Sequence, residues 1–447
     1  MPGMEAPHRD LNSWILDLVR SNRSGVPVGL PSICSANRFV LEAAMQQAQR
    51  DDSVVAIEST SNQVNQFGGY TGMTPDGFAR FIRTIAGLMN FPLHRVLLGG
   101  DHLGPHVWQD EPSESAMAKA RELVGASVRA GYVKIHLDAS MRCVDDPRDE
   151  KGGLAPKTIT ERTADLCEAA ESAYLESPEV RPAPVYVIGT EVPPPGGENA
   201  GAPALSVTSP ADVEETLRLA RRAFAARGLE RAWGRVVGVV VQPGVEFGDS
   251  TVLEYDREKA RELSRYITQN WHVVYEAHST DYQTLRALKE MVEDHFAFLK
   301  VGPWLTFAFR EAVCALEAME REWLSAAGGV RLSGLNETLE RVMLENPKYW
   351  IRYYPGDEAS QRFARKYSYS DRARYYWPHP AVQESLAVLL KNLSDRPTPL
   401  TLLSQHLPNQ YQGVRAGRLS TNPSDLIRDK IMEVLDLYAA ACGRGTR

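Results

Sequence analysis

Eight short apolar runs, separated by turns and helical patterns, constrain the fold of this chain more than any other feature of its sequence. The runs occupy residues 26–34, 54–60, 95–101, 132–140, 185–191, 235–242, 271–279 and 296–302. Segments between them, such as "NRFVLEAAMQQAQR" and "DYQTLRALKEMVEDH", place apolar residues at helical spacing. Strands that alternate with helices form a parallel sheet covered by helices, so eight units predict an α/β fold, a (β/α)8 TIM barrel. An open doubly wound sheet is the second interpretation, weakened because no GxGxxG motif follows the first run.

The regions outside the runs predict two further parts. Leu11, Trp14, Ile15 and Leu18 share one side of an amphipathic pattern, which indicates an N-terminal helix within residues 1–25. The barrel is expected to span residues 26–330. Later segments such as "AVQESLAVLLKNL" predict a helical extension over residues 331–447, packed on the barrel.

Charge and composition exclude several classes of partner. The net charge is −7 and no basic run stands out, which argues against a nucleic-acid partner. No run of about 18 apolar residues is present, so no membrane span is expected. The five cysteines form no CxxC motif, which argues against a disulfide framework and a thiolate zinc site and favours a cytoplasmic protein.

Polar residues end nearly every apolar run. The carboxyl ends of barrel strands meet at one mouth, where the active sites of TIM barrels lie. The sequence therefore predicts a polar site built from these strand ends, which are Glu58, Asp101–His102, Asp138, Glu191, Gln242, Glu276–His278 and Lys300.

The stretch "KIHLDAS" shows this pattern within one run. Alternate side chains of a strand share a face, so Lys134, His136 and Asp138 are expected to point the same way. An amine, an imidazole and a carboxylate are costly to bury unless they bind a ligand or one another. Their inward position predicts a site inside the barrel mouth.

The histidines and carboxylates in these runs are sufficient for a catalytic divalent-metal site. In "GGDHLGP", His102 can bind metal while Asp101 handles a proton. Glu191, His136, Asp138, Glu276 and His278 offer further donors from other strands, and spacing alone does not choose among them. A buried network of salt bridges and hydrogen bonds is the alternative.

Other residues suit a sugar phosphate. Lys300 has three possible roles: a Schiff base with a ketone, a phosphate contact, or neutralisation of nearby carboxylates. Ser279 and Thr280 follow the seventh run, where barrels often hold a phosphate. The segment "ESTSNQVNQFGGYTGMTP" is rich in amides, and Asn62 and Gln63 are candidates to bind sugar hydroxyls.

Several long motifs resemble the tagatose-bisphosphate aldolase Z-type subunit family. They include "ESTSNQVNQFGGYTGMTP", "LLGGDHLGPHVWQ", "AGYVKIHLDASMRCVDDP", "VYEAHSTDYQT", "LKVGPWLTFAFRE" and "RYYWPHP", and together they span nearly the whole chain. The resemblance implies a barrel related to class II, metal-dependent aldolases and a ketohexose phosphate as substrate. Members are described as non-catalytic partners of an aldolase subunit, as tagatose-6-phosphate kinases, or as 4-epimerases.

Comparison with class II aldolases suggests roles for individual residues. Asp101 and His102 are similar to their catalytic Asp and metal-binding His, and His278 to a second metal ligand. The strand-six metal His has no equivalent here, where Gln242 and Glu246 stand instead, so His136 or Glu191 would complete the set. The predicted ligands of a divalent ion (Zn, Mn, Ni or similar) are His102, His136 and His278. The predicted catalytic residues are Asp101, Asp138 and Glu191. The predicted substrate-binding residues are Glu58, Asn62, Gln63, Lys134, Gln242, Ser279, Thr280 and Lys300.

The expected function is a metal-assisted 4-epimerase that interconverts D-tagatose 6-phosphate and D-fructose 6-phosphate. Cleavage of C3–C4, rotation of the aldehyde and re-addition on its other face would invert C4. The first alternative is a non-catalytic subunit that stabilises a class II tagatose-bisphosphate aldolase, and the second is a 4-epimerase of the free ketose. A kinase is disfavoured because no Walker loop is present. The expected partners are a sugar phosphate and either further copies of this chain or a class II aldolase chain.

Overall fold

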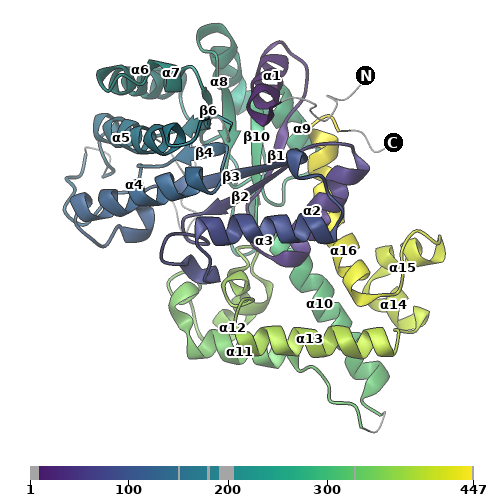
Figure 1. The fold of residues 1–447 in the computed structure, drawn as a ribbon. Helices are drawn as coiled ribbons and strands as arrows, with labels where there is room; N and C mark the ends of the chain where they lie inside the picture. The colour runs from purple at the N-terminus through teal and green to yellow at the C-terminus, as the bar shows by residue number, and fades with distance from the viewer. Residues whose placement is uncertain (1–9, 150–151, 179–181, 191–205, 327–328, 445–447) are drawn as a thin grey trace.

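The computed structural model describes residues 10–149, 152–178, 182–190, 206–326 and 329–444. Its eight parallel strands pair in the closed order β1-β10-β9-β6-β5-β4-β3-β2 (Figure 1). These strands are β1 (Leu30–Ile33), β2 (Val55–Thr60), β3 (Val96–Leu103), β4 (Lys134–Leu137), β5 (Val185–Ile188), β6 (Val236–Val241), β9 (Val274–Ala277) and β10 (Phe296–Val301). Each apolar run overlaps one of them, and the predicted TIM barrel is confirmed.

Helices cover the outside of the barrel, which explains why a strand such as β6, "VVGVVV", is buried along its whole length. The covering helices are α2 (Arg38–Arg50), α3 (Pro75–Leu88), α4 (Ser113–Arg129), α5 (Pro156–Leu175), α6 (Pro210–Ala226), α7 (Glu230–Trp233), α8 (Arg257–Asn270) and α9 (Leu285–Glu293). The next helix, α10 (Pro303–Leu324), runs away from the barrel into the helical extension (Figure 1). Several of the covering helices begin at a capping side chain that accepts from a backbone N–H, as Asn37 does for α2 and Thr284 for α9.

The amino end of the barrel is closed by α1 (Leu11–Arg23). Trp14, Ile15 and Leu18 of this helix share one apolar cluster with strand residues such as Leu30 and Phe298. Figure 1 shows α1 at one end of the barrel and α11 to α13 at the other. A site that ligands can reach is therefore expected at the carboxyl end.

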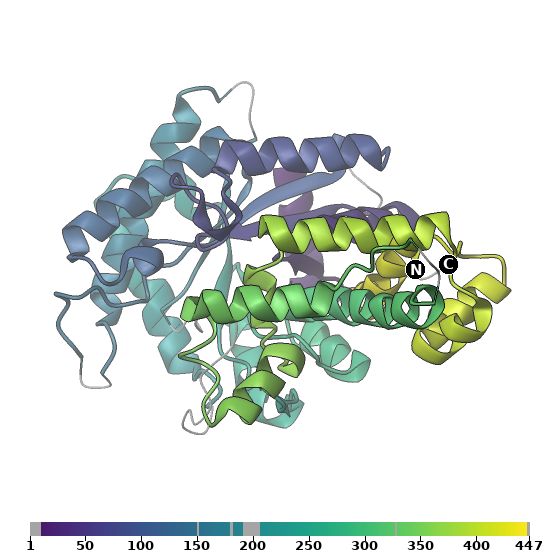
Figure 2. The same cartoon turned by 90° about the horizontal axis from the view of Figure 1, so that it is seen from below.

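The chain after α10 is helical. It consists of α11 (Leu335–Glu345), α12 (Glu358–Tyr367), the 3-10 turn η5 (Arg372–Tyr375), α13 (Pro380–Asp395), α14 (Leu400–His406), α15 (Pro408–Arg415) and α16 (Pro423–Ala441). Seen from below, these green to yellow helices lie in front of one side of the barrel (Figure 2). The last helix, α16, packs against α9, α10 and α2, and so fills the gap in the helical ring after the eighth barrel strand. The domain limits at residues 25 and 330 stay a prediction.

Three smaller features complete the fold. An antiparallel pair, β7 (Glu246–Phe247) with β8 (Val252–Leu253), follows β6 and was not expected from the sequence. All five cysteines are free thiols. Among the described helices, none has the length and apolar character needed to cross a membrane.

Candidate active site at the carboxyl end of the barrel

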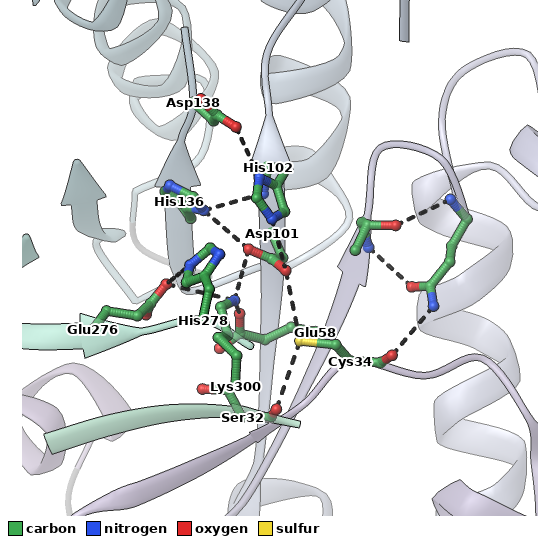
Figure 3. A network of polar contacts seen from close by, with 12 residues as sticks. Ser32, Cys34, Glu58, Asp101, His102, His136, Asp138, Glu276, His278 and Lys300 are labelled. Carbon is green, nitrogen blue, oxygen red and sulfur yellow. Dashed lines mark hydrogen bonds and ion pairs between the residues drawn. The ribbon is translucent and has the colours of Figure 1, made fainter. Parts of the chain in front are cut away.

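Nine ionisable side chains gather inside the carboxyl end of the barrel, and each is at most 5% exposed. Five strands supply seven of them and the residues just after β4 and β9 supply two. Figure 3 labels all of them except Lys134. They are Glu58 on β2, Asp101 and His102 on β3, Lys134 and His136 on β4, Asp138 after β4, Glu276 on β9, His278 after β9, and Lys300 on β10.

Two lysines and the carboxylates form the lower layer of this cluster. Lys134 Nζ donates to Glu58 at 2.9 Å and also to Glu276. Lys300 Nζ pairs with Glu58 and lies 2.7 Å from Asp101 Oδ1. Burial lowers the pKa of both lysines, but the surrounding carboxylates more than reverse this and raise the pKa of each. Both amines stay protonated, so the contacts of Lys300 support charge neutralisation and not attack on a ketone.

Three imidazoles form the upper layer, with ring centroids 4.8 to 5.2 Å apart. His102 Nδ1 lies 2.7 Å from Asp138 Oδ2, and His136 Nδ1 lies 2.9 Å from Asp101 Oδ1. His278 Nε2 lies 3.1 Å from Glu276 Oε1. Every imidazole therefore has a carboxylate partner, the arrangement that orients histidines which bind metal.

The electrostatics of these groups favour ionised carboxylates beside a neutral His278. Burial lowers the pKa of His278 to about 4. Burial alone would raise the pKa of Asp101, but His102 and Lys300 hold it well below its usual range. Burial likewise opposes ionisation of Glu276, and Lys134 and Lys300 hold its pKa well below the usual range. Asp101 is thus an anion that can accept a proton, and His278 keeps a free lone pair.

The donor set fits a divalent cation. One ligand atom each from Asp101, His136, Glu276 and His278 lies within 4.8 Å of the others. His136 Nε2 is buried and has no hydrogen-bond partner. The cluster of nine holds four carboxylates and two ammonium groups, a formal charge of −2 with neutral imidazoles. A buried, unpaired imidazole nitrogen in an anionic cluster is what a bound cation would satisfy.

The structure brings together the three predicted metal ligands His102, His136 and His278, but the donor group that holds two of them does not include His102. His102 is replaced in it by Asp101 and Glu276. His102 Nδ1 is engaged by Asp138, and its Nε2 lies 3.8 Å from Asp101 Oδ2. Its role as a ligand stays a prediction.

Two residues at the site have an uncommon backbone. His102 has a φ of 49° and Ser279 a φ of 53°, the left-handed region that non-glycine residues seldom adopt. Both line the same cavity above the cluster. Backbone of this kind is concentrated at functional sites, where the surrounding structure holds it in place.

A cavity above the cluster receives several of the predicted substrate residues. Asn62, Gln63, Ser279 and Lys300 line it together with Asp101, His102 and His278. The Gln63 amide also donates to Cys34 O at 3.3 Å. Glu58 and Lys134 lie beneath the cavity in the ion-pair layer.

Two predicted substrate-binding residues are placed differently, and one predicted catalytic residue is not described. The Gln242 side chain accepts from the backbone of Gly244 and Val245, and the Thr280 hydroxyl donates to Lys300 O at 2.6 Å. Neither residue is part of the cavity lining. Glu191 lies outside the described residues.

Sequence reasoning missed several residues of the cavity. Cys34 ends the first apolar run, and Asp281 follows the seventh strand. Tyr70 comes from the amide-rich segment, and Arg374 and Tyr375 come from η5 in the extension. The last pair lies in the motif "RARYYWPHP", whose aromatics and arginines were a signal, but pattern alone did not place them at the barrel mouth.

The family follows from comparison with known proteins. The family model described as D-tagatose-1,6-bisphosphate aldolase subunit GatZ/KbaZ-like matches residues 15–443. The chain belongs to the GatZ/KbaZ-like family. The D-tagatose-1,6-bisphosphate aldolase subunits GatZ of Escherichia coli O8 (strain IAI1) and Shigella boydii serotype 18 (strain CDC 3083-94 / BS512) are each 48% identical over 425 residues, 95% of this chain and 99% of theirs.

A solved structure supports the GatZ/KbaZ-like fold. The crystal structure of a probable tagatose 6 phosphate kinase from Sinorhizobium meliloti 1021 superposes with a TM-score of 0.84 and 46% sequence identity. The match covers 93% of this chain and all of that one. The expected family is confirmed, and the names of these relatives connect it with tagatose metabolism.

Proposed function

We propose that this chain is a subunit of an aldolase that cleaves D-tagatose 1,6-bisphosphate. The observation that carries the proposal is the near full-length match, at 48% identity, to two relatives that bear this name. The partner would be a second, class II aldolase chain. This function was the first alternative to the epimerase in the sequence analysis, and the comparisons support it better than the epimerase.

A second candidate function is a metal-assisted 4-epimerase that acts without a partner. The observation that favours it is the convergence of three imidazoles, each with a carboxylate, below an accessible cavity. A subunit that only stabilised a partner would have no physical need for this buried set, because buried charged groups are costly.

The residues present can move the protons that epimerisation requires. Asp101 is ionised and lines the cavity, so it can accept the proton of the C4 hydroxyl. The C3–C4 bond then breaks and its electron pair passes to C3 and the C2 carbonyl. After the aldehyde rotates, C3 attacks its other face and the proton returns, so only the configuration at C4 changes. Glu191 stays the second candidate for this proton.

The metal site has a defined place in this proposal. Asp101, His136, Glu276 and His278 would hold a divalent cation, with His102 as the further candidate. Such an ion supplies Lewis-acid polarisation of the ketose oxygens. Asp138 orients His102, while Lys134 and Lys300 balance the carboxylates.

One experiment separates the two functions. The purified chain, with a divalent cation and D-tagatose 6-phosphate, is followed by carbon NMR with and without a chelator. Appearance of D-fructose 6-phosphate that is lost with the chelator supports the epimerase. No turnover alone, but faster cleavage of D-tagatose 1,6-bisphosphate when a class II aldolase chain is added, supports the subunit. Failure of both tests rejects both proposals.

A further inference from the structure

The two cationic side chains that line the cavity differ in how their charge is balanced. Among the described lining residues, Lys300 and Arg374 are the lysine and arginine. Lys300 is neutralised by Glu58 and Asp101. The guanidinium of Arg374 donates instead to neutral oxygens, the carbonyls of Ser370 and Asp371 and the hydroxyl of Tyr375. No carboxylate in the described part of the chain forms an ion pair with it.

Two other arginines of the same region have carboxylate partners. Arg310 pairs with Asp371 at 3.0 Å, and Arg365 pairs with Glu340 at 2.7 Å. Arg372 lies over the ring of Tyr353 and does not line the cavity. Arg374 is half-buried. A guanidinium partly withdrawn from water without a carboxylate has an uncompensated charge, and an anion bound in the cavity would compensate it.

The place where TIM barrels often bind phosphate is already used here. That place is formed by the loops after the last two strands and the start of the following helix. The backbone N–H groups of Gly302 and Trp304, at the start of α10, donate to Asp281 Oδ1 at 3.0 and 2.8 Å. A carboxylate of the chain occupies this position, so a phosphate entering the cavity needs another cationic partner.

We propose that Arg374 binds the phosphate of the ketohexose phosphate, so that the helical extension supplies the phosphate selectivity of the barrel. This inference rests on the proposed function, since both candidate reactions use a phosphorylated ketose. The planar guanidinium suits a phosphate because it can donate two parallel hydrogen bonds. Lys300 is unsuited to the task, because its ammonium is held by carboxylates beneath the cavity.

Aromatic packing fixes the position of Arg374. Its partner Tyr375 stacks on Tyr349 with ring centroids 4.7 Å apart and an interplanar angle of 6°. Tyr70, from the segment after β2, meets Tyr375 edge-on at 4.7 Å. The guanidinium is thereby placed before any ligand binds, which lowers the entropy lost on binding. The contact with Tyr70 also ties the extension to a loop of the barrel.

The test compares Arg374→Gln and Arg374→Lys with a matched control, Arg362→Gln on the exposed face of α12. Calorimetry measures binding of D-tagatose 6-phosphate, D-tagatose and inorganic phosphate to each full-length protein with its metal. We expect Arg374→Gln to lower the affinity for D-tagatose 6-phosphate by about 100-fold. Its affinity for D-tagatose should stay within about 3-fold of that of the unaltered protein. Arg374→Lys should lower the affinity for D-tagatose 6-phosphate by about 10-fold, because lysine keeps the charge but lacks the two parallel N–H donors of the guanidinium. The control should match the unaltered protein.

The outcomes separate this inference from the proposed function. Equal phosphate and sugar-phosphate binding by Arg374→Gln and Arg362→Gln, with both folded by circular dichroism, overturns the role of Arg374. The role of Arg374 is also overturned if the unaltered protein binds neither phosphate nor D-tagatose 6-phosphate. Phosphate binding that depends on Arg374, without turnover or stimulation of an aldolase, keeps the anion site and rejects the proposed function. If Arg374→Gln does not fold, Arg374→Lys decides: unchanged affinity in that variant counts against the bidentate contact.

Discussion

His102 and Asp138 form a buried pair in which Nδ1 of the imidazole lies 2.7 Å from a carboxylate oxygen. Asp138 Oδ1 accepts in turn from the backbone N–H of Ser140 at 3.0 Å and from its hydroxyl at 2.6 Å. These contacts hold the pKa of Asp138 below its usual value against the effect of burial. Burial lowers the pKa of His102, but Asp101 and Asp138 more than reverse this and raise it. Because Asp138 engages Nδ1, Nε2 is the nitrogen of His102 left to bind a metal ion once it is deprotonated.

Replacing Asp138 by Asn removes this charge while keeping the shape of the side chain. If His102 is a ligand, metal affinity should fall by about 10- to 100-fold, because the imidazole loses the anion that orients it and raises its basicity. The measurement is a zinc titration of chelator-treated protein, with the exposed Asp110→Asn as the control. Equal affinity in the two variants would show that His102 does not depend on Asp138 for binding.

Removal of His278 should abolish metal binding and turnover together. His278 and His136 are the two imidazoles in the four-residue donor group, so His278→Ala leaves an incomplete site. Metal content by mass spectrometry is expected to fall from about one ion per chain to near zero. His295→Ala is the matched control, because His295 precedes β10 at the amino end and contacts Asn22. An unchanged metal content in His278→Ala would reject its role as a ligand.

Lys134 should matter for stability as much as for the site. It is fully buried between Glu58 and Glu276, so Lys134→Met leaves two carboxylates without their cation. The free energy of unfolding should drop by about 3 kcal/mol or more. Adding Glu276→Gln should recover part of this loss, since it removes one uncompensated charge.

Urea unfolding monitored by circular dichroism measures each free energy, with Lys391→Met as the control. Lys391 pairs with Asp395 on the surface, where such a pair contributes less than about 1 kcal/mol. Adding Glu276→Gln to Lys391→Met should not raise the free energy of unfolding. A double variant no more stable than Lys134→Met would argue against charge balance as the role of Lys134.

The fold could be predicted from the sequence because one pattern repeats. Each apolar run is buried on both faces of the barrel, so it reads as a continuous apolar segment, and eight of them in regular alternation with helices leave few topologies. The inward direction of Lys134 and His136 followed from strand alternation alone. The role of α16 could not be predicted, because nothing local distinguishes a helix that returns to the barrel from one that stays in the extension.

The candidate site was predictable where it lies on strands and less so where it depends on loops. His102, His136 and His278 converge because parallel strand ends share one edge. The Thr280 hydroxyl turns instead toward Lys300 O and Tyr438, and Gln242 accepts from its own turn. Arg374 is 74 residues beyond Lys300 in the chain, and only the packing of the extension brings both to one cavity. Local spacing carries no information on such contacts.

Asp281 should give the protein a pH dependence that Asp281→Asn removes. Burial raises the pKa of Asp281 to about 6 from 3.8, although the N–H groups of Trp304 and Gly302 oppose the rise. Between these values the folded protein holds a proton that the unfolded chain has lost, so this group makes stability fall as pH rises from about 4 to 6. The neutral Asn keeps an oxygen for the two N–H groups and does not ionise.

Between pH 4 and pH 7, the free energy of unfolding of Asp281→Asn should therefore rise by on the order of 3 kcal/mol relative to that of the unaltered protein. Urea unfolding at several pH values checks this, with Asp110→Asn expected to show no such gain. A difference between Asp281→Asn and the unaltered protein that does not change with pH would show that folding does not raise the pKa of Asp281.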